Sequence, residues 1–243
     1  MEEEQMGNGS AADPELHPVA EEKGPQDGGG QRIVEPENAL PEASLEQLPE
    51  RIRAACAQAG WAKLLPVQAR AIPYILAGRN LMVQSQTGSG KTGAFLLPIM
   101  QRIDLAQKQC QALVLVPTRE LASQVSHEAE TLGGELGLRT AVVYGGVKYG
   151  PQLEAFRAGA QLVVGTPGRI LDHLLKGTLV LDELKIFVFD EADRMLSMGF
   201  YPDMKRVQQF LPKKPVDGYL FSATIPPFVN RLAAEFLRKP EFL

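Results

Sequence analysis

The sequence predicts an α/β domain in which a mostly parallel β-sheet carries helices on both faces. Two observations predict this fold class. Six short apolar runs of four or five residues recur along the chain, and most are separated by stretches that include a plausible amphipathic helix. Because parallel strands need a long crossover connection, this repeated alternation of strand and helix indicates a parallel sheet that is buried on both faces.

The predicted strands are rich in β-branched, aromatic and leucine side chains. In chain order they are "NLMVQ" from Asn80, "ALVLV" from Ala112, "TAVVY" from Thr140, "QLVVG" from Gln161, "IFVFD" from Ile186 and "YLFSA" from Tyr219. The predicted helices include "RELASQVSHEAETLGGELG" after Pro117 and "GRILDHLLKG" after Pro167. A parallel α/β sheet binds ligands at the carboxyl ends of its strands, so functional residues are expected directly after these runs.

The N-terminal region differs in charge from the rest of the chain. Residues 1–50 carry 13 acidic and 2 basic side chains, a net charge of -11, which leaves 23 basic and 16 acidic side chains, a net charge of +7, in residues 51–243. Residues 1–42 are rich in Glu, Gly and Pro without apolar periodicity, so we predict a disordered acidic tail before a domain at residues 43–243. The basic domain is compatible with a phosphate-rich partner.

The sequence has neither the basic start and apolar run of a signal peptide nor 18 consecutive apolar residues. We therefore expect a soluble protein of the cytoplasm, or of the nucleus in a eukaryote, without membrane contact. Cys56 and Cys110 lack metal-ligand spacing and are expected to be reduced thiols. His17, His127 and His173 also lack partners at metal spacing, which favours packing or surface roles.

The first predicted strand is followed by "SQTGSGKT", from Ser85 to Thr92. It fits the phosphate-loop pattern G-x-x-x-x-G-K-[ST] except that serine replaces the first glycine. Gly88 and Gly90 allow a tight turn that aims N–H groups at a phosphate, Lys91 opens a helix and contacts the outer phosphates, and Thr92 offers a hydroxyl to magnesium. The alternative, a Gly/Ser-rich surface turn, is disfavoured because the loop follows a buried strand. The remaining residues of the predicted nucleotide loop are Gln86, Thr87 and Ser89.

The run "FVFDEAD" supplies acidic groups for the same chemistry. Four apolar residues lead into Asp190, so a carboxylate stands at a strand end, where it can hold magnesium directly or through water. Glu191 beside it can orient or deprotonate an attacking water. A solvated charge cluster is the alternative, but two carboxylates at the mouth of a buried strand are costly without a cation.

These residues resemble the first RecA-like domain of the DEAD-box RNA helicases. The resemblance covers about residues 43–243 and rests on six motifs in the family's order: "SQTGSGKT", "PTRELA", "GG", "TPGR", "DEAD" and "SAT". It implies a RecA-like P-loop NTPase fold, ATP and Mg²⁺ as cofactors, and RNA as partner. The implied catalytic residues are Lys91, Asp190 and Glu191, with Thr92 and Asp190 as magnesium ligands.

The resemblance also implies an RNA path and a coupling element. Glycine N–H groups, threonine hydroxyls and arginine side chains suit phosphate and ribose oxygens and do not read bases, so binding should tolerate any sequence. The implied RNA-binding residues are Pro117, Thr118, Arg119, Gly145, Gly146, Thr166, Pro167, Gly168 and Arg169. Ser222 and Thr224 would hydrogen-bond with Asp193 and couple the state of ATP to the grip on RNA.

Upstream, "GWAKLLPVQ" resembles the adenine-recognition element of the family. Gln68 would pair with the amide-like edge of adenine, because glutamine carries both a donor and an acceptor, and Trp61 occupies the usual aromatic position. The family usually has a further aromatic residue seventeen positions before Gly60, where this chain has Ala43. A ring on adenine is worth about 1–3 kcal/mol by analogy with base stacking, so we expect a relaxed preference for adenine.

Helicases of this type close two RecA-like domains around ATP and RNA, and the second domain supplies arginines. This sequence stops soon after the last motif of the first domain, so we expect nucleotide binding with very slow hydrolysis. The alternatives are a non-catalytic RNA- or protein-binding module derived from a helicase, a DNA-acting helicase of the same superfamily, and a P-loop kinase, for which no acceptor lid is identified. The acidic tail is by default solubilising, with partner docking or RNA mimicry as alternatives.

Overall fold

The computed structural model describes residue 36 and residues 38–243, so most of the acidic tail predicted for residues 1–42 lies outside the described residues. The segment just before the domain already contacts it. The Leu40 N–H donates to the Tyr74 hydroxyl at 2.9 Å, and the Asn38 carbonyl accepts a hydrogen bond from Arg79 at 3.0 Å. A short 3₁₀ helix, η1 (Leu45–Gln47), follows.

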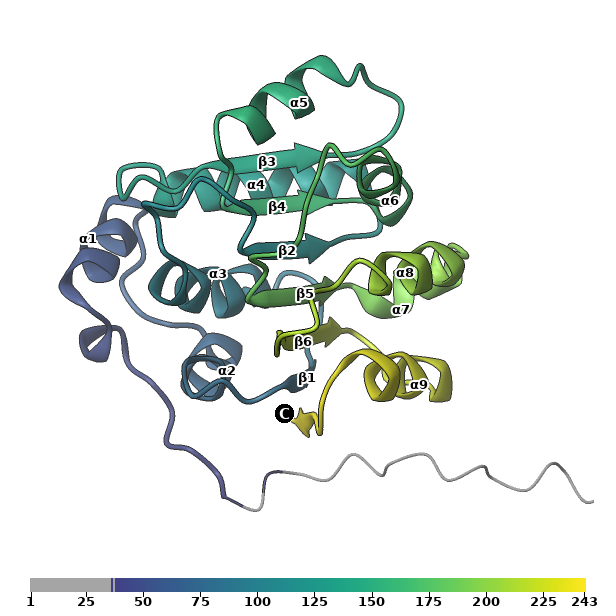
Figure 1. The fold of residues 1–243 in the computed structure, drawn as a ribbon. Helices are drawn as coiled ribbons and strands as arrows, with labels where there is room; N and C mark the ends of the chain where they lie inside the picture. Colours follow the sequence, from purple (N-terminus) through teal and green to yellow (C-terminus); the bar gives the residue numbers. More distant parts are fainter. Residues whose placement is uncertain (1–35, 37) are drawn as a thin grey trace, which may run out of the picture. The chain divides into compact units, whose positions relative to one another are not determined.

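Within the described residues, seven strands form one sheet in the order β3-β4-β2-β5-β6-β1-β7. Every strand pair is parallel, which confirms the predicted fold class, and the arrows of β2 to β6 point the same way in Figure 1. The six predicted strands are present, and the two-residue strand β7 was not predicted. The strands are β1 (Leu81–Gln84), β2 (Ala112–Leu115), β3 (Thr140–Val143), β4 (Leu162–Gly165), β5 (Ile186–Asp190), β6 (Asp217–Ser222) and β7 (Glu241–Phe242).

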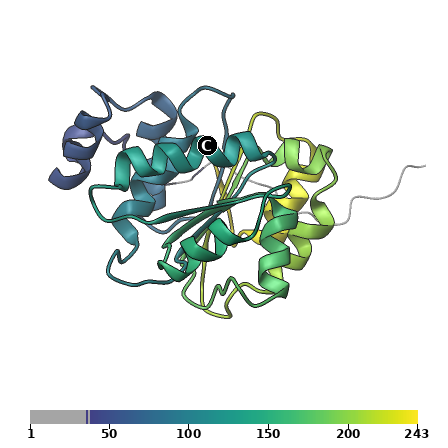
Figure 2. The same ribbon diagram turned by 90° about the horizontal axis from the view of Figure 1, so that it is seen from above.

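Helices cover both faces of the sheet. One layer comprises α1 (Glu50–Gln58), α2 (Pro66–Leu76), α3 (Lys91–Arg102) and α4 (Arg119–Gly133). The other layer comprises α5 (Gly150–Arg157), α6 (Pro167–Leu175), α7 (Ala192–Ser197), α8 (Tyr201–Gln208) and α9 (Pro227–Phe236). Figure 2, in which the domain is seen from above, shows the two layers on opposite sides of the strands.

The strands bury alternate side chains in the two layers. In β2, Val114 packs among α1–α4, whereas Leu113 and Leu115 pack among α6–α9. All three are completely buried, as expected for a parallel strand covered on both faces. The apolar runs therefore form two cores, and their carboxyl ends are left to carry polar residues at one edge of the sheet.

Candidate nucleotide site

The parallel sheet brings all six motifs to the same edge. "SQTGSGKT" follows β1, Ser222 ends β6 and Asp190 ends β5, and these three strands are neighbours. The motifs at Pro117, at Gly145 and at Thr166 follow β2, β3 and β4, which are neighbours in the other half of the sheet. The edge thus has one half that carries the candidate nucleotide residues and one half that carries the candidate RNA residues.

The phosphate loop depends on two glycines with left-handed backbone. Gly88 has φ 82° and Gly90 φ 89°, and Gly90 caps α3 directly before Lys91. A Cβ at Gly90 would also lie 2.9 Å from the Gln68 amide nitrogen, so a larger residue cannot be accommodated without displacing that side chain. The loop therefore turns sharply from β1 into α3, whose N-terminal N–H groups favour anions.

Ser85 occupies the first position of the loop pattern, where glycine is usual. Its backbone N–H donates to the Ser222 carbonyl at 2.9 Å, and its hydroxyl lies 2.5 Å from the Ser89 hydroxyl. Ser89 in turn donates to the Gln86 carbonyl at 2.7 Å. The serine thus fits the strand exit and ties the two ends of the loop together, so its departure from the pattern does not disrupt the turn.

Lys91 lies at the start of α3 with only 6% of its surface exposed. Its ammonium donates to the Ser85 carbonyl at 3.1 Å, which closes the loop on itself. The ammonium therefore has one neutral backbone acceptor, and its charge partly opposes the rise that burial causes in the pKa of Asp190. An ammonium with three donors and this one carbonyl partner retains donors for the outer phosphates of a nucleotide.

Asp190 is the most perturbed acidic group of the site. It is 2% exposed, and its Oδ1 atom has no hydrogen-bond partner. Burial raises its pKa to about 6, with Glu191 and Glu128 adding to the effect and Lys91 opposing it. A buried, partly unpaired carboxylate of this kind fits a divalent cation, because a cation would satisfy the free oxygen.

No cluster of three or more His, Cys, Asp or Glu side chains that could hold a metal occurs among the residues that the structure describes. Thr92 and Asp190, both lining the same cleft, supply only two oxygen ligands. This number fits Mg²⁺, which usually keeps several waters and binds through one or two protein groups plus substrate phosphates.

Glu191 has an unusual backbone. Its φ is 56°, a left-handed conformation that is uncommon for a non-glycine residue and frequent at functional sites. Its side chain is fixed from two sides, because Thr87 donates to Oε1 at 3.4 Å and Arg194 pairs with Oε2 at 3.3 Å. The carboxylate is thereby aimed across the phosphate loop, where it can orient a water molecule.

The loop, the DEAD segment and α4 enclose a cleft with a volume of about 540 Å³. This volume is within the usual range for small-molecule sites, about 300–1,000 Å³. Thr118, from the candidate RNA half, also lines the cleft, so the two halves of the edge meet there. The charged or hydroxylic residues that concern the chemistry are Lys91, Thr92, Glu128, Asp190, Glu191 and Arg194.

The hydrogen bonds expected between the DEAD and SAT motifs are present. Asp193 Oδ2 accepts from the Thr224 hydroxyl at 2.7 Å and from the Thr224 N–H at 3.0 Å, and the Asp193 N–H donates to the Ser222 hydroxyl at 3.2 Å. Burial opposes ionisation of Asp193, but these hydrogen bonds prevail and lower its pKa. The end of β6 is thus tied to α7, directly beside Glu191.

The two residues expected to recognise adenine pack onto the start of α3 and do not line the cleft. Gln68 is buried, its amide donates to the Gly90 carbonyl at 3.0 Å, and its oxygen accepts from the Leu65 N–H at 2.8 Å. Trp61 packs beside it, since a Cβ at Gly93 would lie 2.4 Å from the Trp61 ring. Both polar ends of Gln68 are therefore already engaged, and one of its amide hydrogens remains for a ligand.

The candidate RNA residues differ in exposure and in whether their polar groups already have partners within the protein. The Thr118 hydroxyl caps α4 by accepting from the Leu121 N–H at 3.2 Å. Arg119 is exposed and pairs with Glu120 at 2.6 Å, a contact that a phosphate can replace at little cost because surface ion pairs are weak. Gly145 and Gly146 lie exposed after β3. Pro167 is buried and begins α6, whose remaining motif residues are Thr166, Gly168 and Arg169.

Five residues that line the cleft were not among the predicted site residues: Glu120, Leu121, Gln124, Glu128 and Arg194. Arg194 stands three positions after Glu191, at a spacing that places both on one side of α7. Gln124 and Glu128 of α4 also line the cleft, on the same face as Leu121. The spacing of Leu121, Gln124 and Glu128 could have indicated that they share a face, because residues three and four positions apart lie on the same side of a helix.

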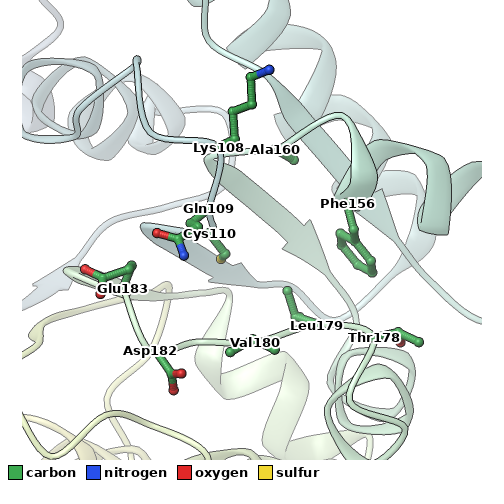
Figure 3. Close-up of a pocket in the computed structure, with 10 residues that line it drawn as sticks. All are labelled: Lys108, Gln109, Cys110, Phe156, Ala160, Thr178, Leu179, Val180, Asp182 and Glu183. Atoms are coloured by element: carbon green, nitrogen blue, oxygen red, sulfur yellow. The ribbon is translucent and has the colours of Figure 1, made fainter.

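Cys110 and His173 have structural surroundings, whereas His17 lies outside the described residues. Cys110 lines a smaller pocket at the opposite edge of the sheet, together with Phe156, Leu179 and others (Figure 3). Burial raises the pKa of its thiol to about 12, so it is not a nucleophile. His173 is buried and both ring nitrogens are bonded, to Thr178 and Gln152, which confirms the predicted packing role.

None of the described helices is long and apolar enough to cross a membrane.

Fold and site together define a RecA-like domain with a P-loop. Residues 65–232 match the sequence model of the DEAD/DEAH box helicase family. The match spans more than half of the chain, and this protein therefore belongs to that family.

Similar proteins agree with this assignment. The "ATP-dependent RNA helicase DeaD" of Haemophilus influenzae is 46% identical over 195 residues, which cover 80% of this chain and 32% of the relative. The protein of the same description from Escherichia coli K12 is 46% identical over 183 residues, covering 75% of this chain and 29% of the relative. This chain thus spans about a third of the length of these relatives.

A solved structure is similar as well. The crystal structure of a DEAD box protein from the hyperthermophile Methanococcus jannaschii matches with a TM-score of 0.76 and 40% sequence identity. The match covers 81% of this chain and 53% of that chain. The observed sheet and helices are therefore those of one RecA-like domain of a DEAD-box protein.

Proposed function

We propose that this chain is the ATP-binding and RNA-binding half of an ATP-dependent RNA helicase. The supporting observation is that one cleft combines Lys91, Thr92, Asp190 and Glu191 at the carboxyl edge of the sheet. Relatives described as ATP-dependent RNA helicases favour ATP and RNA over the other partners of P-loop proteins.

In this proposal the residues of the cleft divide the work of nucleotide binding. Lys91 exchanges its bond with the Ser85 carbonyl for the outer phosphate oxygens, and Thr92 with Asp190 holds the magnesium ion. When bound, Mg²⁺ neutralises charge on the phosphate oxygens. Glu191 accepts a hydrogen bond from the attacking water and is kept in place by Thr87 and Arg194.

We further propose that this chain alone hydrolyses ATP slowly. Among the described residues that line the cleft, Arg194 is the only arginine, and its guanidinium pairs with Glu191. Arginines that contact the transferred phosphate are worth about 10³–10⁵ in rate. A second RecA-like domain is therefore the proposed source of that arginine and of full activity.

The exposed edge beyond β2, β4 and β3 is the proposed RNA path. The free Thr166 hydroxyl, the glycine loop after β3 and the exposed Arg119 are suited to phosphate and ribose oxygens. None of these groups presents a base-reading pattern, so we expect contacts that tolerate any RNA sequence.

The test supplies the second RecA-like domain of a DeaD relative in trans and measures ATP hydrolysis with and without single-stranded RNA. We expect RNA to accelerate hydrolysis by the wild-type chain and to have no effect on Lys91→Ala. Glu191→Gln should retain nucleotide binding without turnover. A DNA oligomer of the same sequence serves as control, since equal stimulation by DNA would contradict the RNA assignment. No stimulation of the wild type, with Lys91→Ala indistinguishable from it, would overturn the proposal.

A further inference from the structure

Tyr149 lies at the centre of a polar cluster that joins the glycine loop after β3 to α6. It is the last residue before α5, and its ring contacts two cations: the Arg169 guanidinium lies 4.4 Å and the Lys176 ammonium 4.1 Å from the ring centroid. The Lys176 ammonium also donates to the Tyr149 hydroxyl at 2.7 Å, and the hydroxyl donates to the Asp172 carboxylate. The tyrosine thus contacts three charged side chains that are spaced along α6, from Arg169 in the first turn to Lys176 at the C-cap.

Arg169 faces this cluster, and only 12% of its side chain is exposed. Besides the Tyr149 ring, it reaches the carboxylate of Asp172 at 3.9 Å and donates to the Val147 carbonyl at 3.1 Å. The last contact fixes the backbone of the glycine loop itself. The Arg169 guanidinium therefore already has several partners within the protein. Arg119, in contrast, is exposed.

His173 of α6 forms a second link between α5 and α6, in addition to the contacts of Tyr149. The ring of His173 bonds to Gln152 of α5 at 3.0 Å and to Thr178 at 2.8 Å, and it meets the Tyr149 ring edge-on at 5.2 Å. Burial, reinforced by the cations Arg169 and Lys176, lowers the pKa of His173, while Asp172 opposes this. The imidazole thus packs edge-on against the Tyr149 ring and links it to α5 through Gln152.

The glycine loop needs such support because its own packing does not determine its position. A Cβ added at Gly145 or Gly146 would meet no atom within 4 Å, and both residues are exposed. Gly146 is favoured by its left-handed backbone (φ 82°), but at Gly145 the absence of a side chain serves no internal contact and leaves the backbone open for the approach of a ligand. Flexible backbone that binds phosphate must be held in place to avoid an entropy loss on binding.

We propose that Tyr149 is a positioning residue for RNA: with Arg169 it fixes the glycine loop against α6, and Arg169 acts through the loop rather than by contacting a phosphate. This inference rests on the proposed RNA-binding function. It assigns Arg169 a different task from Arg119, although both belong to motifs that the sequence associates with RNA.

The test measures the affinity of the chain for a labelled single-stranded RNA by fluorescence anisotropy at several salt concentrations. Each phosphate contact contributes about 0.7 to the slope of log affinity against log salt. Arg119→Gln should therefore reduce the slope by about 0.7. Arg169→Gln and Tyr149→Leu should weaken binding roughly tenfold with the slope of the wild type, because the loop is released but no contact charge is lost.

Two variants separate positioning from general destabilisation. Tyr149→Phe keeps the ring against Arg169 and should restore affinity to within about twofold of the wild type, because the contact with Arg169 that holds the loop needs the ring and not the hydroxyl. Tyr201→Leu is the matched control, because Tyr201 likewise donates to a carboxylate, that of Glu235, near Lys205. It should leave RNA affinity unchanged. Fluorescent ADP should bind all variants equally.

Hydrogen exchange gives a readout that needs no RNA. Amide exchange in the segment 144–149 should accelerate in Tyr149→Leu and in Arg169→Gln, but not in Tyr149→Phe or Tyr201→Leu. A slope for Arg169→Gln reduced like that of Arg119→Gln, or unchanged exchange in Tyr149→Leu, would overturn the positioning role. If the wild-type chain binds no RNA at low salt, the proposed RNA function fails instead, and the exchange result still decides whether Tyr149 holds the loop.

Discussion

Replacing Asp190 by asparagine should stabilise the protein in the absence of nucleotide. The carboxylate is 2% exposed, its Oδ1 has no hydrogen-bond partner, and burial raises its pKa from the usual 3.8 to about 6. The difference between these pKa values means that the ionised carboxylate lowers the free energy of unfolding by about 3 kcal/mol. Because the asparagine amide brings N–H groups that also need partners, we expect a gain of about 1–3 kcal/mol at pH 8.

The sign of the pH dependence follows from the raised pKa. The folded state binds the Asp190 proton more tightly than the unfolded state, so the cost is absent below about pH 4, grows between pH 4 and 6, and is complete above about pH 7. The stability difference between Asp190→Asn and the wild type should therefore be largest at pH 8 and vanish near pH 4. Taking the difference at each pH cancels the titration of groups that do not interact with Asp190.

The assay is urea unfolding of both proteins at pH 4, 6 and 8, with the exposed Asp182→Asn as control, which should change stability by less than about 0.5 kcal/mol. In thermal unfolding the expected gain corresponds to about 2–4 °C per kcal/mol. ADP should stabilise both proteins, and magnesium should add to this stabilisation in the wild type but not in Asp190→Asn. A variant less stable than the wild type at pH 8, or a stability difference independent of pH, would refute the interpretation of Asp190 as a carboxylate that burial destabilises and a bound cation would stabilise.

Three further predictions concern other parts of the domain. Asp193→Ala should remove the hydrogen bonds to Thr224 and abolish RNA stimulation of ATP hydrolysis in the two-domain assay, while fluorescent ADP still binds; retained stimulation would exclude a coupling role. Ala43→Phe should increase the preference for ATP over GTP in competition titrations, and strong discrimination by the wild type would contradict the relaxed preference. Because burial lowers the pKa of His173, the contribution of this residue to stability should fall as pH drops below about 6.5, and urea unfolding should show the wild type losing stability relative to His173→Gln over that range.

The sequence was sufficient for most of the fold because buried parallel strands are continuous apolar runs, as in β2 and β5. It was insufficient where polar residues belong to a strand. β6 begins at Asp217, which pairs with Arg102, and at Gly218, whose N–H donates to the Asn80 side chain at 2.8 Å. These partners lie more than 100 residues away in the chain, and no local pattern reveals them. The two residues of β7 are too few to show any periodicity.

The sequence predicted those site residues whose positions follow directly from the ends of the strands. Lys91 and Asp190 could be expected at one edge from the parallel sheet alone, and both line the cleft. The directions of side chains could not be predicted in the same way. Nothing in the "TPGR" motif indicates that Arg169 turns toward Tyr149, because that contact depends on how α5 and α6 pack. Arg194 was missed for the same reason, since its partner is decided by the bend at Glu191.

The most direct measurement of the central claim is calorimetric titration of the folded chain with ADP, with and without magnesium. We expect the wild type to bind the nucleotide more tightly when magnesium is present, Lys91→Ala to lose most of the affinity in both conditions, and Asp190→Asn to lose the magnesium dependence alone. Equal heats for the three proteins, or no heat from the wild type at millimolar ADP, would contradict a nucleotide site between Lys91 and Asp190.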